Sequence, residues 1–409
     1  MVQNTTLEAS RMTEAVLTTP FHGRTAPLVR GATWRRWAGY VVPASYDLVH
    51  DLEYAAIRGT AALIDVTPLF KYRLRGPGAE ALLDRVVTRD VTRCRVGQVL
   101  YTPWCDADGK VLDDGTLTRL EEDDFRLTSA HPNLRWLHQN AVGIDVSVVD
   151  ETGEIAALSL QGPAAREVLG RATDADLGAL AFFRATEARV DGVPVTITRT
   201  GYTGDLGYEI WVANDQAEGL WDRLLAAGGP HGLMPTGLLA MDVARIEAGL
   251  VLIDVDYVSA RRALVEPQLS SPFELGLGWT VARGKGPFVG QRALAAERER
   301  AAAWRLVGIA VDWDSQEALF AEVGLPPQLP AAAWRTSRPV YVDDRQVGYA
   351  TSGCWSPLLK RSIALAHLEA AHAAPGTEVD LEVTVEHRRR RARATVVKTP
   401  FFDPERKRA

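Results

Sequence analysis

The chain has 409 residues, of which 46% are hydrophobic and 24% charged, enough apolar surface for two or three soluble domains with buried cores. A formal net charge of −6 argues against nucleic acid as the main partner, because nucleic-acid binding calls for a basic surface. The three cysteines lack a C-x-x-C spacing, and the eight histidines show no metal-ligand spacing. We therefore expect a cytoplasmic protein that uses no metal and no disulfide framework.

The N-terminal part of the chain predicts a tail followed by an α+β domain. Residues 1–20 are polar and of mixed charge, without the apolar core of a secretory signal, and no membrane span follows, so we expect a flexible tail and no membrane contact. Residues 69–75 alternate like a strand, and after a glycine turn residues 79–87 have helical spacing.

The segment from Tyr101 to Asp114 is the first candidate for a site. It reads as a strand end, a glycine turn and a pair of carboxylates, Asp113 and Asp114, between alternating hydrophobic residues. Adjacent residues of a strand point to opposite faces, so one acid is expected to face inward. A buried carboxylate needs a hydrogen-bond partner, and an N–H group of a ligand would supply one.

The segment Arg199–Glu209 is the second and more specific candidate, because it combines Gly201, Gly204 and Gly207 with two tyrosines and two acids. Alternating runs on either side, 195–198 and 210–212, predict strands, so the glycines lie in a turn that brings the backbone close to a ligand. The two oxygens of Glu209 can accept a paired hydrogen bond from a planar N–H/NH₂ edge, such as that of a pterin ring. The alternative is a glycine-rich hairpin that ends in a solvated acid.

The remaining chain predicts two helices and then a β-rich domain. Residues 215–228 and 238–248 each carry one apolar face, whereas 278–281, 306–311, 339–342 and 383–386 read as short strands. Residues 312–335 contain several prolines and predict an irregular lobe of unknown purpose. The basic run 387–393 reads as a charged strand edge, with binding of an acidic tail as the alternative.

These segments together resemble the folate-binding aminomethyltransferase family, which includes the T-protein of the glycine cleavage system and tetrahydrofolate-dependent demethylases. The resemblance runs from Phe21 to Pro400, and Arg199–Glu209 is its most specific motif. It implies an α+β, three-domain fold around a central folate channel with a β-barrel C-terminal domain. The implied domains are the tail 1–20, a discontinuous folate-binding domain of 21–52 and 145–272, a ferredoxin-like domain of 53–144, and a barrel-like domain of 273–409.

The resemblance also implies roles for single residues. Asp113 would be the catalytic carboxylate that orients the folate amine, while Tyr101, Tyr202 and Glu209 would bind tetrahydrofolate. The family carries an arginine where this chain has Met241, four residues before Arg245, and smaller polar residues where it has Trp104. We expect Trp104, Met241 and Arg245 to line an altered, more apolar donor pocket.

These departures favour a demethylase that moves a methyl or methylene group from a small N-, O- or S-methylated metabolite to tetrahydrofolate. The alternative is a T-protein aminomethyltransferase of the glycine cleavage system, and a third reading is a non-catalytic folate-binding protein. A lipoyl carrier protein or a separate flavoprotein is the expected protein partner.

Overall fold

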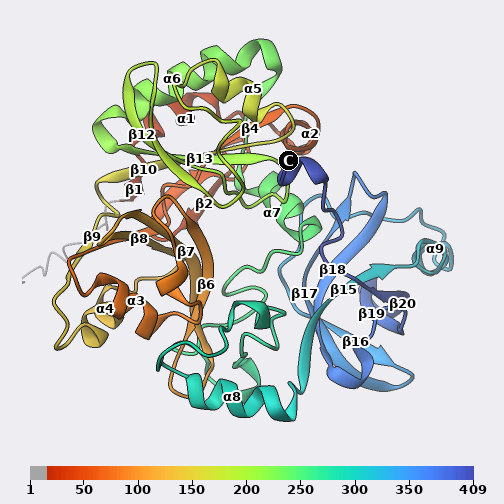
Figure 1. The fold of residues 1–409 in the computed structure, drawn as a ribbon. Helices are drawn as coiled ribbons and strands as arrows, with labels where there is room; N and C mark the ends of the chain where they lie inside the picture. Colours follow the sequence, from red (N-terminus) through yellow and green to blue (C-terminus); the bar gives the residue numbers. More distant parts are fainter. Residues whose placement is uncertain (1–15) are drawn as a thin grey trace, which may run out of the picture.

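The structure is a computed structural model that describes residues 16–409, and its elements form three units around the middle of the molecule (Figure 1). Most of the predicted tail 1–20 lies outside the described residues. Within them, β1 (Leu17–Thr18) pairs in parallel with β3 (Tyr40–Pro43), which also pairs with β2 (Trp34–Trp37). The end of the tail is therefore part of a small sheet that packs beside the first unit.

The first unit is built on a six-stranded mixed sheet of order β11-β12-β13-β10-β4-β14. Its strands are β4 (Ala61–Asp65), β10 (Ile155–Gln161), β11 (Ala185–Val190), β12 (Val193–Thr198), β13 (Gly207–Ala213) and β14 (Leu233–Pro235). Its helices are α1 (His22–Thr25), α2 (Asp51–Gly59), α5 (Ala165–Gly170), α6 (Ala217–Gly228) and α7 (Leu238–Glu247). The strands predicted on either side of the glycine-rich turn, and both predicted helices, are confirmed.

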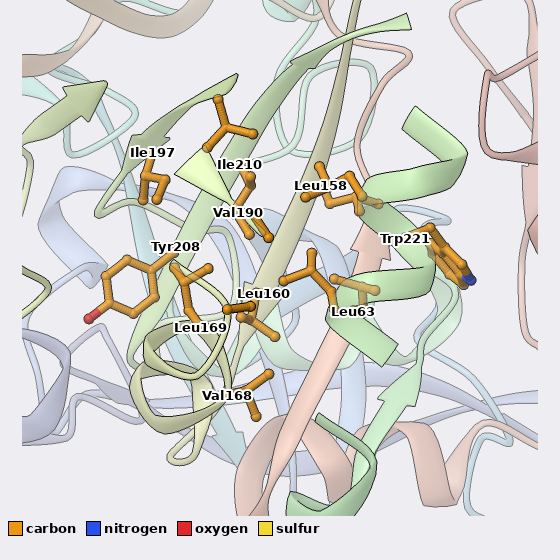
Figure 2. Packing of buried hydrophobic residues seen from close by; sticks show 14 of the residues in the cluster. Leu63, Leu158, Leu160, Val168, Leu169, Val190, Ile197, Tyr208, Ile210 and Trp221 are labelled. Carbon is orange, nitrogen blue, oxygen red and sulfur yellow. The ribbon is translucent and has the colours of Figure 1, made fainter. Parts of the chain in front are cut away.

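Alternation along the strands gives this sheet two differently covered faces. One face packs on α5 and α6, where Leu158, Ile210 and Trp221 meet in a closely packed core (Figure 2). The other face of β4 packs on α2 and α7 through Ala62 and Ile246. Helix α7 therefore lies between the first sheet and the rest of the molecule, as Figure 1 shows.

The second unit is an antiparallel five-stranded sheet of order β6-β7-β8-β5-β9 with two helices. Its elements are β5 (Phe70–Arg75), α3 (Ala79–Val86), β6 (Val99–Cys105), β7 (Val111–Glu121), β8 (Asp124–Ser129), α4 (Leu134–Asn140) and β9 (Ser147–Asp150). The order of strand, helix, three strands, helix and strand has one strand more than a ferredoxin-like unit.

The domain boundaries differ from those expected in two places. Strand β4 pairs with β10, so residues 53–65 lie in the first unit and not in the second. Strand β9 pairs with β5, so residues 147–150 lie in the second unit. A strand belongs to the sheet in which it is hydrogen-bonded to a neighbouring strand. The local sequence does not show which distant strands pair in this way.

The third unit is a closed six-stranded barrel of order β15-β18-β17-β16-β19-β20, as the resemblance implied. Its strands are β15 (Trp304–Val311), β16 (Arg338–Val342), β17 (Arg345–Ser356), β18 (Arg361–Glu369), β19 (Glu378–Val385) and β20 (Arg388–Val397). Helix α8 (Gln291–Arg300) precedes the barrel, and after the last strand the chain returns to the first unit (Figure 1).

Two expectations for this part of the chain are corrected, and a third is confirmed. Residues 278–280 form a 3₁₀ turn and not a strand. The lobe 312–335 begins with helix α9 (Trp313–Ala321), whose first turn is capped by the Asp312 carboxylate accepting from Ser315 N at 2.8 Å. The basic run lies mainly on β20, where residues 388–393 pair with β19 on one side while β15 pairs only with residues 394–397, so the run forms a charged strand edge as expected.

Gly115 is a position where the fold tolerates no side chain, because a Cβ there would meet the carbonyl oxygen of Thr128 on the neighbouring strand β8. We expect Gly115→Ala to lower the free energy of unfolding by about 1–3 kcal/mol, since β8 must move away from β7. Urea unfolding measures this difference. Gly153→Ala is the control, because nothing lies within 4 Å of its added Cβ; an equal effect of both substitutions would contradict the packing argument.

Candidate active site

The two adjacent aspartates of β7 point to opposite faces of the second sheet. Strands β6 and β7 pair so that Trp104 lies opposite Asp113 and Pro103 lies opposite Asp114. Asp113 consequently faces the core that contains the Trp104 ring, whereas Asp114 faces the side of the sheet where Tyr101 and Tyr257 lie. This is the arrangement that the alternation predicts.

Asp113 is fully enclosed by the protein, with 0% of its surface exposed. Its Oδ1 accepts from Asp114 N at 2.9 Å, and its Oδ2 accepts from His131 N at 2.9 Å and from Asn133 Nδ2 at 2.8 Å. Burial and the charge of Asp114 raise the pKa of Asp113 to about 7, although these three N–H donors favour the ionised form. Asp113 therefore fixes the connection from β8 to α4 through Asn133 and His131.

Asp114 is partly exposed and lies between two phenols. The hydroxyl of Tyr101 donates to Oδ2 at 2.8 Å, and the hydroxyl of Tyr257 donates to Oδ1. Burial raises the pKa of Asp114, while both hydroxyl donors lower it. The ring of Tyr101 stacks on Trp279, with centroids 6.2 Å apart, and Trp279 is largely exposed. The result is a carboxylate in an aromatic surround with one side open.

The glycine-rich turn contributes Tyr202 and Glu209 from the first unit. Tyr202 is half-buried, and its hydroxyl donates to the carbonyl oxygen of Val251. Burial raises the pKa of Tyr202. Val251 packs in one apolar cluster with Tyr257, whose hydroxyl donates to Asp114, so the two predicted site segments lie near each other. Glu209 lies on β13 on the face opposite Tyr208, and its Oε2 accepts from the Thr200 hydroxyl at 2.7 Å.

The residues predicted for the donor pocket lie in different surroundings. Trp104 is 0% exposed within the second core, where its Nε1 donates to Asn133 Oδ1 at 3.3 Å. Met241 is half-buried and packs in a cluster with Trp37 and Trp211. Arg245 is buried and paired with two aspartates. The structure brings Met241 and Arg245 together on α7 but leaves Trp104 inside a core.

Sequence reasoning did not single out Tyr257, Asn133 or Trp279. Tyr257 and Trp279 lie in the irregular connection between α7 and α8, which has no periodic pattern. The carboxylate pair is the one sequence signal that could have indicated such residues, because a second partly buried acid also needs a hydrogen-bond donor.

Among residues 16–409, no group of three His, Cys, Asp or Glu side chains is arranged to hold a metal ion. No helix of this described range is long and apolar enough to cross a membrane.

The raised pKa of Asp113 predicts a pH dependence of stability. The folded state keeps a proton on this carboxyl up to about pH 7, whereas an unfolded aspartate loses it near pH 4. Its contribution to the free energy of unfolding is therefore largest below pH 4 and falls as the pH rises to 7, by up to about 1.4 kcal/mol per pH unit. Denaturant titrations at several pH values compare the wild type with Asp113→Asn. A constant difference between them from pH 4 to 7 would contradict the raised pKa.

Comparison with known proteins agrees with this architecture. The sequence profile of the GCVT N-terminal domain matches residues 24–285, and that of the glycine cleavage T-protein C-terminal barrel domain matches residues 322–403. Aminomethyltransferases of Bacillus cereus and Bacillus mycoides are each 34% identical over 372 residues, which cover 90% of this chain and 93% of the relative.

A solved structure is similar over nearly the whole length. The crystal structure of the glycine cleavage system aminomethyltransferase T from Bartonella henselae superimposes with a TM-score of 0.80 at 26% identity, covering 95% of this chain and 99% of that one. The match includes both the first two units and the barrel. The chain therefore belongs to the glycine cleavage T-protein family of aminomethyltransferases.

Proposed function

We propose that this chain is a tetrahydrofolate-dependent aminomethyltransferase that moves a one-carbon unit from an aminomethyl donor to tetrahydrofolate. The sequence alone favoured a demethylase acting on a free methylated metabolite. The relatives support the alternative instead, because the chain covers nearly their full length and they are named aminomethyltransferases. A lipoyl carrier protein is then the expected source of the donor, and a flavoprotein partner or a small methylated substrate belongs to the demethylase alternative.

The residues at the site fit the hydrogen-bonding needs of a reduced pterin. Asp114 and Glu209 are partly exposed carboxylates on facing units, and each can accept from ring N–H and NH₂ groups. Tyr101 and Trp279 provide aromatic surface beside Asp114, and Tyr202 adds an aromatic ring from the glycine-rich turn that precedes Glu209. Tetrahydrofolate, when bound, supplies a nucleophilic nitrogen.

Asp114, clamped by two tyrosine hydroxyls, is the observation that carries this proposal. Burial raises the pKa of Asp114 above its usual range, and the carboxylate has one open side, so it binds a proton more readily than an exposed aspartate does and can exchange that proton with a ligand. Its two phenol donors fix the carboxylate in orientation, so little reorganisation is needed when charge changes at a reacting nitrogen. The aromatic surround limits access of water to the same point.

Geometry thus assigns the two aspartates different roles. Asp114 has an open side and is the group proposed to touch the ligand. Asp113, whose oxygens accept three protein N–H groups, is proposed to position β7 and the connection to α4. The prediction from the resemblance, that Asp113 itself is the catalytic carboxylate, stays as the competing assignment.

Substitution of each aspartate by asparagine separates these assignments. We expect Asp114→Asn to lower kcat by about 10²–10⁴-fold with folding retained, because the proton-accepting group is lost. In Asp113→Asn the new amide NH₂ group would face protein N–H groups that are themselves donors. We therefore expect this variant to lose about 1–3 kcal/mol of stability and to lower kcat less than Asp114→Asn does. Single-turnover rates and unfolding curves of both variants give the comparison. A larger loss of kcat in Asp113→Asn would instead support the assignment from the resemblance.

The donor is identified by the product that forms on tetrahydrofolate. The purified protein is first titrated with tetrahydrofolate by calorimetry, and the complex is then given either the aminomethylated lipoyl carrier or a panel of free methylated amines, ethers and thioethers. We expect methylene-tetrahydrofolate from the carrier. Methyl-tetrahydrofolate from a free compound would support the demethylase alternative, and absence of folate binding would exclude both.

A further inference from the structure

A second group of charged side chains, which the proposed chemistry leaves unexplained, surrounds Asp242 on α7. Arg245 Nε donates to its Oδ1 at 2.9 Å, and Arg335 Nε donates to its Oδ2 at 2.7 Å. Arg35 Nη1 lies 3.9 Å from the same Oδ2. Arg245 also pairs with Asp256. We call these five residues the Asp242 cluster.

The Asp242 cluster carries more positive than negative charge. It holds three guanidinium groups but only two carboxylates. Asp256 is already saturated, because Leu252 N and Arg245 donate to its Oδ2 and the hydroxyls of Thr351 and Ser352 each donate to its Oδ1 at 2.6 Å. One unit of positive charge in the cluster is therefore not matched by a carboxylate.

Two N–H-bearing atoms of the cluster are buried without a hydrogen-bond partner, namely Nη1 of Arg35 and Nη2 of Arg245. Such groups are rare in folded proteins and commonly mark a place that a ligand completes. Burial lowers the pKa of Arg35, and the nearby charge of Arg335 lowers it further. The two arginines repel each other across a single carboxylate oxygen, and an additional anion would relieve that repulsion.

The cluster is closed on one side and open on the other. The side chains of Asp242 and Arg245 are each 1% exposed, whereas those of Arg35 and Arg335 are 31% and 36% exposed. Arg35 comes from β2, and Arg335 comes from the end of the segment 312–335 that follows β15 and α9. Two segments far apart in sequence thus each place an arginine at the open side of the same buried carboxylate.

The Asp242 cluster also lies close to the candidate active site. Arg245 Nη1 donates to the carbonyl oxygen of Leu250 at 3.3 Å, and the hydroxyl of Tyr202 donates to that of the next residue, Val251. Met241, which directly precedes Asp242, packs with Trp211 on the strand that carries Glu209. A ligand that contacts Tyr202 and Glu209 is therefore within reach of the cluster.

We propose that Arg35 and Arg335 form a carboxylate-binding subsite at the open side of the Asp242 cluster. A carboxylate supplies one negative charge, which matches the excess, and accepts paired hydrogen bonds from the planar guanidinium fork. This inference rests on the proposed function, because it assigns the carboxylate to a ligand of the same site. The carboxylate belongs either to the glutamate moiety of tetrahydrofolate or, under the demethylase alternative, to an amino-acid-like donor.

Calorimetry with two matched pterins tests the subsite. Tetrahydrofolate carries the glutamate carboxylates, whereas tetrahydropteroate is used as its primary amide, which carries no carboxylate. We expect Arg335→Gln and Arg35→Gln each to weaken tetrahydrofolate binding by roughly tenfold or more, the value of one charge-assisted hydrogen bond, and to leave tetrahydropteroate binding unchanged. Arg335→Lys keeps the charge but loses the fork, so we expect a smaller loss.

The same calorimetry serves for the control variant and for the second possible source of the carboxylate, the amino-acid-like donor. Arg389→Gln removes one positive charge from the largely exposed side chain of Arg389 on the barrel and should change neither pterin. If both pterins bind equally well to Arg335→Gln and to the wild type, N-methylglycine is titrated into the tetrahydrofolate complex. Binding to the wild type that weakens in Arg335→Gln assigns the subsite to the donor.

The remaining outcomes overturn the proposal. Equal weakening of tetrahydrofolate and tetrahydropteroate would show a structural effect, and unchanged binding of all three ligands would show that the arginines bind none of them. Failure of the proposed function is seen separately, because the wild type would then bind neither pterin. In that case glutarate is the probe: binding that Arg335→Gln loses supports a carboxylate subsite, and no binding overturns it.

Discussion

The buried carboxylate of Glu247, at the end of α7, is the interaction on which the arrangement of the units depends. It is fully enclosed, and a buried charge is tolerated only when all its hydrogen bonds are met. Tyr54 and Arg58 of α2 donate to it, at 2.5 Å from the hydroxyl and 2.6 Å from Nη2, and the Ser356 hydroxyl at the end of β17 donates to it as well. These partners come from the first unit and the barrel, so the charge is satisfied only when the two are docked.

The same helix fixes the geometry of the candidate site through Asp256. Arg245 of α7 pairs with this aspartate, and Thr351 and Ser352 of the barrel donate to it. Its carbonyl oxygen is 2.7 Å from Nε2 of His367. The next residue is Tyr257, whose hydroxyl donates to Asp114 of the second unit. An irregular segment is thus held in place from both sides, and the orientation of Asp114 depends on contacts in all three units.

Local pattern explains which parts of this arrangement could be predicted. The strands around the glycine-rich turn, and the opposite directions of Asp113 and Asp114, follow from an alternation with a period of two. This alternation can be seen directly in the sequence. Which aspartate meets the open side does not follow, because that choice depends on where Asn133 and Tyr257 lie. Both come from segments without periodicity. The expected boundary at residue 53 is wrong for a similar reason, because nothing in the sequence of residues 53–65 identifies β10 as the strand with which β4 pairs.

The lobe 312–335 illustrates a further limit. Its prolines indicate an interruption of the barrel ladder, but its composition does not reveal the helix α9 that begins after the Asp312 cap. The role of Arg335 was invisible, because a lone arginine in a polar segment carries no pattern. Only the buried Asp242, 93 positions earlier, gives it a partner.

Rigidity of the glycine-rich turn follows from buried charge as well. Asp205, in the middle of this turn, accepts from Arg406 Nε and Nη2 at 2.6 and 2.8 Å, and Arg58 Nη1 lies 3.5 Å from it. Arg58 Nη1 also donates to Thr203 O at 2.9 Å. Arg406 belongs to the segment that returns from the barrel to the first unit, as Figure 1 shows. Glycines alone would leave the turn with many conformations, each of which a ligand would have to exclude at a cost in entropy. Because Arg58 joins Asp205 to Glu247, the contact that docks the barrel also sets the turn, so a ligand at Tyr202 and Glu209 meets a surface that is already ordered.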